Sequence, residues 1–194
     1  MRPSLFYFVG FAGHTDSTKV KLLQDALRDI ADIHILKPAY LQPDIAFDHI
    51  TEQIKVAARM ASKVVFAGIS FGAFYAMVLG ERFDVPYLLV NPVLSPSGLI
   101  DKIGHSALAF LGVKEDTYQL HATYKSIEDG LEITQSLATV LVANDDEYLN
   151  HSATVARFKY AKVTQFDTGT HSFLQHWPIV IDKLRDELLT IEHK

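Results

Sequence analysis

The chain alternates along its whole length between short apolar runs and longer segments whose apolar residues recur at helical spacing. The first run, Leu5 to Val9, is apolar at every position, as expected for a strand covered on both faces. Similar runs predict further strands at 33–36, 63–67, 86–90, 137–142 and 162–166. Repeated strand–helix units predict a mostly parallel sheet of about six strands, joined by right-handed crossovers, with helices on both faces.

The segments between these runs predict the helices. Expected helices cover 18–30, 44–62, 71–83, 152–160 and 178–191. The stretch 93–135 contains no strand-like run, and apolar residues at helical spacing predict one helix from 99 to 111 within it. Because the sequence shows neither a linker nor an internal repeat, we predict one domain over 1–194. In this interpretation 93–135 is a helical insertion above the strand ends, where such folds bind ligands.

Composition excludes several classes of protein. The 194 residues are 48% hydrophobic and 21% charged, which is typical of a folded domain. A formal net charge of -5, with no block of Lys or Arg, argues against binding to nucleic acid or to anionic lipid. The N-terminal apolar run is too short for a signal peptide, and glycines interrupt the uncharged stretch 64–80. We therefore expect a cytoplasmic protein without a membrane partner.

Cofactor motifs are also missing from the sequence. The chain has no cysteine, which removes disulfides, thiolate metal sites and cysteine nucleophiles. It contains no G-x-G-x-x-G, no G-x-x-x-x-G-K-[ST] and no H-E-x-x-H motif. We expect neither a cofactor nor a metal.

The residues with the clearest chemical meaning are Gly68-Ile69-Ser70-Phe71-Gly72, a G-x-S-x-G motif between a predicted strand and a predicted helix. A serine on such a tight turn projects its hydroxyl clear of the backbone. The residues two before and two after it approach each other, so glycine fits at both positions. The N–H group of Phe71, at the start of the helix, is placed to stabilise an oxyanion. The alternative to a catalytic site is a tight turn whose glycines only allow the strand and the helix to pack closely.

A nucleophilic serine needs a base and an acid, which should follow it in the order acid, then histidine. His171 lies in a loop directly after the last predicted strand, where the base belongs, whereas His176 begins the next helix and is interpreted as structural or as part of the rim of the site. The acid should follow the fifth predicted strand, where Asp145, Asp146 and Glu147 are adjacent. Glu147 is the least favoured of the three, because it should begin the next helical segment.

These motifs together resemble the α/β-hydrolase superfamily, and more closely the small bacterial YqiA/YcfP-type esterases. The carriers are Phe8-Val9-Gly10-Phe11, the G-x-S-x-G motif, Val90-Asn91-Pro92, Asp146-Glu147 and Gly169-Thr170-His171-Ser172-Phe173. The resemblance covers nearly the full chain and implies a three-layer α/β-hydrolase-like fold. It also implies that Asp146, which precedes a Glu, is the acid, and that the Phe11 N–H is the second oxyanion donor. One departure is Val9, where the family usually has His.

The ordered set Ser70, Asp146 and His171 predicts a serine hydrolase that cleaves carboxylic esters of short or medium acyl chains through an acyl-enzyme. The expected partner is a small-molecule ester whose acyl group is held by apolar residues of 93–135. A thioesterase or an amidase could use the same residues, since the pocket rather than the triad recognises the leaving group. A further alternative is a non-catalytic α/β-hydrolase scaffold that binds a ligand without turnover, which the valine at position 9 mildly favours.

Overall fold

The computed structural model describes residues 1–110 and 113–190, with the side chains of 107, 109 and 110 left out. Its described part contains a six-stranded sheet of order β2-β1-β3-β4-β5-β6, in which each neighbouring pair is parallel. The strands are β1 (Ser4–Phe8), β2 (Asp32–Leu36), β3 (Val64–Ile69), β4 (Tyr87–Val90), β5 (Ala138–Ala143) and β6 (Lys162–Phe166). Each agrees with its predicted run apart from small shifts at the ends, so the parallel sheet is confirmed.

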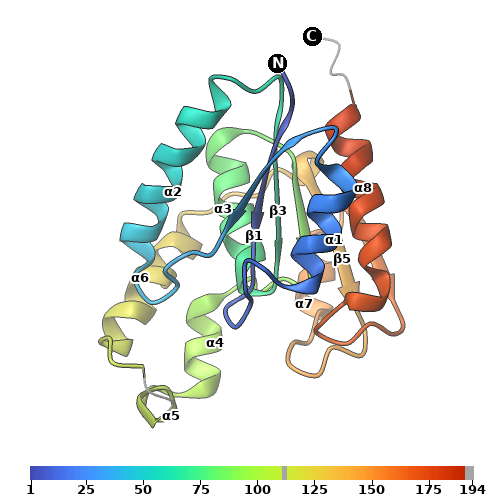
Figure 1. Ribbon diagram of the computed structural model, residues 1–194. Helices are drawn as coiled ribbons and strands as arrows, with labels where there is room; N and C mark the ends of the chain where they lie inside the picture. The colour runs from blue at the N-terminus through green and yellow to red at the C-terminus, as the bar shows by residue number, and fades with distance from the viewer. Residues whose placement is uncertain (111–112, 191–194) are drawn as a thin grey trace.

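Helices cover both faces of this sheet, as Figure 1 shows. The helices are α1 (Thr18–Leu27), α2 (Pro43–Ala58), α3 (Phe71–Phe83), α4 (Pro96–Ile103), α5 (His105–Phe110), α6 (Thr117–Asp129), α7 (Ser152–Arg157) and α8 (Trp177–Leu189). Two short 3-10 helices, η1 (Gln135–Leu137) and η2 (Leu174–His176), precede β5 and α8. Apolar residues of α1 and α8 form the core on one face of the sheet, and those of α2 and α3 form the core on the other. The predicted three-layer architecture is therefore present.

The strands divide their side chains between these two cores. On β1, Leu5 and Tyr7 contribute to the α1/α8 side, whereas Phe6 and Phe8 contribute to the α2/α3 side, and all four are almost fully buried. Successive side chains of a strand point to opposite faces, so a strand covered twice is apolar at every position. This is the physical origin of the continuous apolar runs.

The prediction of a single helix over 99–111 was wrong. Helix α4 ends at Ile103, and Gly104 has a φ of 86°, in a region that L side chains rarely adopt, before α5 begins at His105. Leu111, at the predicted end, lies outside the described residues. A third helix, α6, then occupies 117–129, where the side chain of Asp116 accepts hydrogen bonds from the N–H groups of Tyr118 and Gln119. The described part of 93–135 thus folds as three helices.

The sheet order creates a crevice between the loops that follow β1 and β3. From β1 the chain moves outward to β2 and then returns to β3 on the other side of β1. In open parallel sheets such a change of direction separates neighbouring loops at the carboxyl ends of the strands, where ligands bind. Figure 1 shows α4 and α5 beyond this end of the sheet. Within residues 1–110 and 113–190, no helix combines the length and apolar character needed to span a bilayer.

Candidate active site

Ser70 occupies the tight turn between β3 and α3 that the motif predicts. Its φ of 57° and ψ of -123° are strained for a residue with a side chain. The turn is fixed by hydrogen bonds from the Ser70 N–H to the Val90 carbonyl (2.9 Å) and from the Val93 N–H to the Ser70 carbonyl (3.1 Å). The serine therefore lies at the carboxyl end of β3, and hydrogen bonds hold it to the chain at the end of β4.

The two glycines of the motif are required by close backbone approach. A Cβ at Gly68 would lie 2.4 Å from the Gly72 carbonyl oxygen, and one at Gly72 would lie 2.2 Å from the carbonyl oxygen of Phe8. Because real Cβ atoms do not come this close to backbone oxygen, a larger residue at either position would displace β1, β3 or α3. The glycines allow α3 to begin directly beneath the end of β1.

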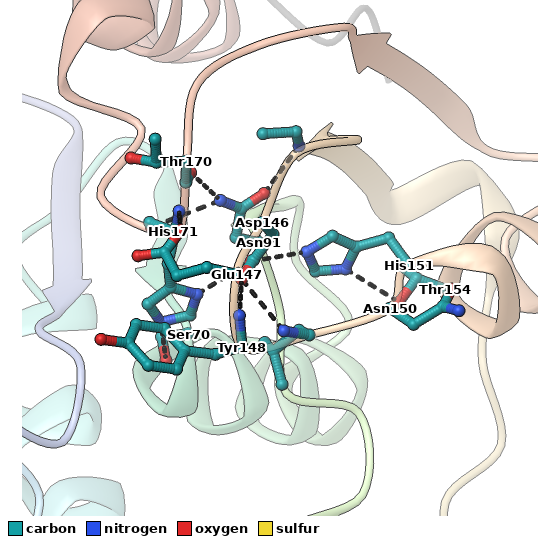
Figure 2. A network of polar contacts seen from close by, with 12 residues as sticks. Ser70, Asn91, Asp146, Glu147, Tyr148, Asn150, His151, Thr154, Thr170 and His171 are labelled. Atoms are coloured by element: carbon teal, nitrogen blue, oxygen red, sulfur yellow. Dashed lines mark hydrogen bonds and ion pairs between the residues drawn. The ribbon is translucent and has the colours of Figure 1, made fainter.

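Three side chains from distant parts of the sequence form one chain of hydrogen bonds, drawn in Figure 2. The Ser70 Oγ lies 2.9 Å from the His171 Nε2, and the His171 Nδ1 lies 2.8 Å from the Asp146 Oδ2. They follow β3, β6 and β5 respectively, so the carboxyl ends of three parallel strands bring them together. The structure thus places the predicted serine, histidine and Asp146 in direct contact.

The side chain of Asp146 is buried, and its carboxylate accepts four hydrogen bonds. Its Oδ1 accepts from the N–H groups of Tyr148 (2.9 Å) and Leu149 (3.0 Å), and its Oδ2 is the partner of His151 (2.9 Å) and His171 (2.8 Å). Burial alone would raise the pKa of the Asp146 carboxyl. The hydrogen bonds from the two histidines and the two backbone groups outweigh burial and hold its pKa well below the ordinary value. The carboxylate is therefore ionised and acts only as an acceptor.

The two neighbouring carboxylates bind the backbone of residues 169–173, the histidine loop, and not the His171 imidazole. Asp145 Oδ1 accepts the N–H of Thr170 at 2.7 Å, and Glu147 Oε2 accepts the N–H of His171 at 2.8 Å. Thr170 has a φ of 53°, so its backbone is held in the left-handed region. Sequence reasoning disfavoured Glu147 and, through the family resemblance, chose Asp146 over Asp145; the geometry gives each carboxylate a different contact, and of the three it is Asp146 that contacts the His171 ring.

Asn91 is a site residue to which the sequence analysis assigned no role. It is fully buried and has a φ of 40°, which asparagine tolerates better than most residues. Its Nδ2 donates to the carbonyls of Thr170 (2.9 Å) and His171 (3.3 Å), and its Oδ1 accepts the Ala143 N–H (2.8 Å). Asn91 therefore ties the end of β4 to the end of β5 and to the histidine loop. An asparagine directly after an apolar strand was the available signal.

The predicted oxyanion donors are the backbone N–H groups of Phe71, the residue after Ser70, and of Phe11, in the loop after β1. Phe71 follows Ser70 at the first position of α3, and the loop after β1 passes close by, since a Cβ at Gly10 would lie 3.8 Å from the Ser70 Oγ. In the described part of the chain, neither the Phe71 nor the Phe11 N–H donates to a backbone acceptor in a turn, loop or cap. Both predicted oxyanion donors line the same cavity as Ser70 and His171.

The valine at position 9 does not leave the β1 loop without polar support. The Tyr40 hydroxyl donates to the Val9 carbonyl, and the Val9 N–H donates to the Leu36 carbonyl at 3.0 Å. The Tyr124 hydroxyl in turn donates to the Tyr40 carbonyl at 2.6 Å. Two buried tyrosines, one between β2 and α2 and one in α6, thus order this loop.

The cavity beside Ser70 has a volume of about 540 Å³ and walls that are mostly apolar. The helices of 93–135 provide one side of it through Leu99, Ile100, Ile103, Leu108, Leu120 and Tyr124. Aromatic rings of Phe11, Tyr40 and Phe71 also line it and contact one another, with ring centroids 4.9–6.1 Å apart. The predicted apolar pocket beside the serine is present.

Two further side chains contact the pair formed by His171 and Asp146, and sequence reasoning missed both. The Tyr148 ring packs edge-on against the His171 imidazole, with centroids 5.2 Å apart and planes 89° apart. His151 reaches Asp146 from the other side and is buried. His176 has the structural role expected for it, because its ring packs against Phe166 and its Nε2 lies 2.7 Å from the Thr168 carbonyl oxygen. A histidine five residues after the acid was the signal for His151.

The sheet, the strained serine turn and the location of the site at the strand ends are those of the α/β-hydrolase fold. Est1E from Butyrivibrio proteoclasticus has this fold in common with the chain, with a TM-score of 0.73 at 17% identity, over 97% of this chain and 87% of Est1E. A solved structure of the metagenome-derived lipolytic enzymes LipS and LipT gives a TM-score of 0.64 at 11% identity, over 96% of this chain and 93% of that chain.

The chain belongs to the family described as "Uncharacterised protein family (UPF0227)", whose model matches residues 4–181. A UPF0227 protein of Serratia proteamaculans (strain 568) is 23% identical over 176 residues, which cover 87% of this chain and 90% of that relative. The resemblance to the α/β hydrolases and to their YqiA/YcfP-type members is therefore confirmed.

Proposed function

We propose that the protein is a serine hydrolase that cleaves carboxylic esters. The observation that carries the proposal is the continuous chain of contacts from Ser70 Oγ through His171 to the buried carboxylate of Asp146, at 2.9 and 2.8 Å. An ionised Asp146 requires the His171 Nδ1 to carry a proton, so the Nε2 lone pair faces the serine hydroxyl. This tautomer is the one a general base needs.

The reaction follows from these positions. Ser70 Oγ attacks the acyl carbon while its proton passes to His171 Nε2, and the N–H groups of Phe71 and Phe11 stabilise the oxyanion. His171 returns the proton to the departing alkoxide, which leaves as an alcohol and gives an acyl-enzyme. A water molecule then attacks the acyl carbon with His171 as base, and the acid is released as Ser70 regains its proton.

The cavity supports an uncharged, apolar acyl group. Two of the tyrosine hydroxyls that line it are already engaged, because Tyr40 donates to the Val9 carbonyl and Tyr124 donates to the Tyr40 carbonyl. Burying apolar surface is favourable by about 25 cal/mol per Å², so short to medium acyl chains gain affinity from these walls. That LipS and LipT are described as lipolytic enzymes is consistent with this substrate class.

The test compares hydrolysis of p-nitrophenyl esters by the wild type and by Ser70→Ala. We expect kcat to fall by about 10³ or more in the variant, since only the oxyanion donors and binding would remain. An unchanged rate would remove Ser70 from the mechanism. Thioester and amide substrates in the same panel decide whether the leaving group is an alcohol, and binding without any turnover would identify a non-catalytic scaffold.

A further inference from the structure

The carboxylate of Asp146 has an imidazole on each side. Figure 2 shows His171 and His151 on either side of it, and both rings use the same oxygen, Oδ2, at 2.8 and 2.9 Å. The scheme proposed above uses His171 alone. His151 is therefore a second buried histidine in direct contact with the proposed acid, and none of the proposed proton transfers involves it.

The position of His151 is fixed by its surroundings. The residue lies directly before α7, its carbonyl accepts the Val155 N–H at 2.9 Å, and its side chain is only 5% exposed. The second ring nitrogen, Nδ1, faces the Thr154 Oγ1 at 3.5 Å. His151 also lines a second cavity, and the one Lys or Arg among the described residues of its wall is Lys102, whose Nζ donates to the Tyr148 carbonyl at 3.5 Å. Glu147 in the same wall is engaged by the His171 N–H.

The direction of both bonds follows from the charge on Asp146. Since the carboxylate is ionised, it can only accept, so the N–H groups at His151 Nε2 and His171 Nδ1 each donate a hydrogen bond to Oδ2. The other oxygen is occupied by the N–H groups of Tyr148 and Leu149. A buried carboxylate with all its acceptor positions filled by fixed donors is held in one orientation, and here two rings share the acceptor Oδ2.

We propose that His151 is a positioning residue for the reaction, acting through Asp146; the inference rests on the proposed function. The His151 N–H holds Oδ2 in the direction that His171 requires and weakens the Asp146–His171 bond by sharing the acceptor. A histidine that only filled space beside α7 would need its shape but not its donor. The two roles predict different behaviour for substitutions that keep or remove the N–H.

The experiment compares His151→Leu with His151→Gln, whose side-chain amide places an N–H close to the position of the histidine Nε2. In the leucine variant we expect kcat on a p-nitrophenyl ester to fall by about 10- to 100-fold with KM within about twofold, because a buried charge loses one donor. In the glutamine variant we expect kcat within about threefold of the wild type. The rate of Ser70 labelling by a fluorophosphonate should follow the same order.

His34→Leu is the matched control, because it also removes a buried imidazole nitrogen. His34 Nε2 is buried and, among the described residues, has no hydrogen-bond partner; its ring stacks on Phe6 in β1. This variant should keep wild-type kcat. Its thermal midpoint shows how much stability changes when a histidine ring with a buried nitrogen is lost away from the site, so the folding effect of His151→Leu can be separated from its effect on kcat.

Proton NMR supplies a readout that a purely structural role would not move. The low-field imidazole N–H signal of His171, assigned by its absence in His171→Gln, should move further downfield in His151→Leu because His171 then has Oδ2 to itself. It should stay near the wild-type position in His151→Gln. An unmoved His171 signal in the leucine variant, wild-type kcat in that variant, or equal losses in the glutamine and leucine variants would each overturn the proposal.

The two proposals fail in different ways. A wild-type protein that is not labelled at Ser70 and hydrolyses no ester contradicts the proposed function, and the NMR comparison still decides the contact between His151 and Asp146. A wild type that is labelled and active, with a leucine variant that matches it, contradicts only the role of His151.

Discussion

The histidine loop and the helical segment 93–135 are held by different kinds of contact. The loop 169–173 is held by polar contacts from Asn91, Asp145 and Glu147, and the Ser172 carbonyl accepts a hydrogen bond from Lys19 at 2.9 Å. The helices of 93–135 face the cavity with apolar side chains, and their path bends at Gly104. Directional bonds fix the proposed catalytic atoms, whereas apolar contacts of no fixed direction shape the space for the substrate.

This difference predicts that the histidine loop determines the rate of the chemical step and that the helical segment determines which substrate is preferred. Substitutions in the polar loop should change the rate of the chemical step for every substrate, because they displace His171 or its partner. Substitutions in the helical segment should change which acyl chain is preferred and leave the reactivity of Ser70 intact. Each prediction below tests one side of this division.

The largest effect is expected at Asp146. Asp146→Asn keeps the shape of the side chain but favours the wrong tautomer of His171, and kcat should fall by about 10³- to 10⁴-fold. Asp145→Asn is the matched control, since Asp145 contacts the Thr170 N–H and not the imidazole. Steady-state kinetics of both variants measure the difference. Equal losses in the two variants would show that the sequence neighbour, and not Asp146 alone, serves His171.

A smaller effect, seen in stability as well as in rate, is expected at Asn91. Asn91→Ala leaves the Ala143 N–H and the loop carbonyls without their partner in a buried location, which should lower the free energy of unfolding by about 2–4 kcal/mol. Urea denaturation measures this change, and kcat should fall for short and long acyl chains alike. A loss confined to one chain length would place Asn91 in substrate recognition and contradict its assignment to the loop.

The smallest effect is expected in the helical segment. Ile103 lines the cavity and is 40% exposed, so Ile103→Ser should fold normally. In the wild type, kcat/KM should rise by up to about fourfold for each CH₂ added to the acyl chain until the cavity is full. The serine variant should show a shallower rise and an unchanged rate on acetyl esters. A uniform loss, acetyl esters included, would mean that this segment also affects the chemical step.

The sheet and the three contacting residues could be predicted from the sequence because short-range patterns encode them. Strands covered on both faces must be apolar throughout, and the approach of Gly68 to Gly72 leaves room for no side chain. Ser70, Asp146 and His171 each follow a strand, and a parallel sheet brings such positions to one edge. To predict that these residues lie close together, it was therefore enough to assign the strands and to expect the serine, the acid and the histidine in that order along the chain.

The remaining features depend on contacts between segments that no local pattern records. The break at Gly104 was missed because apolar spacing continues through it, although a glycine is the residue that a φ of 86° favours. The roles of Asp145, Glu147 and Asn91 depend on where the backbone of the histidine loop lies, which is a property of the assembled loops. His151 lies before α7, and only the turn after Asp146 directs its ring back to the carboxylate.

The most direct test of the account is mass spectrometry of the protein after reaction with a fluorophosphonate probe. We predict one adduct on the peptide that carries Ser70, formed rapidly in the wild type and at least about 10³-fold more slowly in His171→Gln, where no base accepts the serine proton. A wild-type Ser70 that stays unlabelled, or one that reacts equally fast without His171, would contradict the claim that this imidazole activates this hydroxyl.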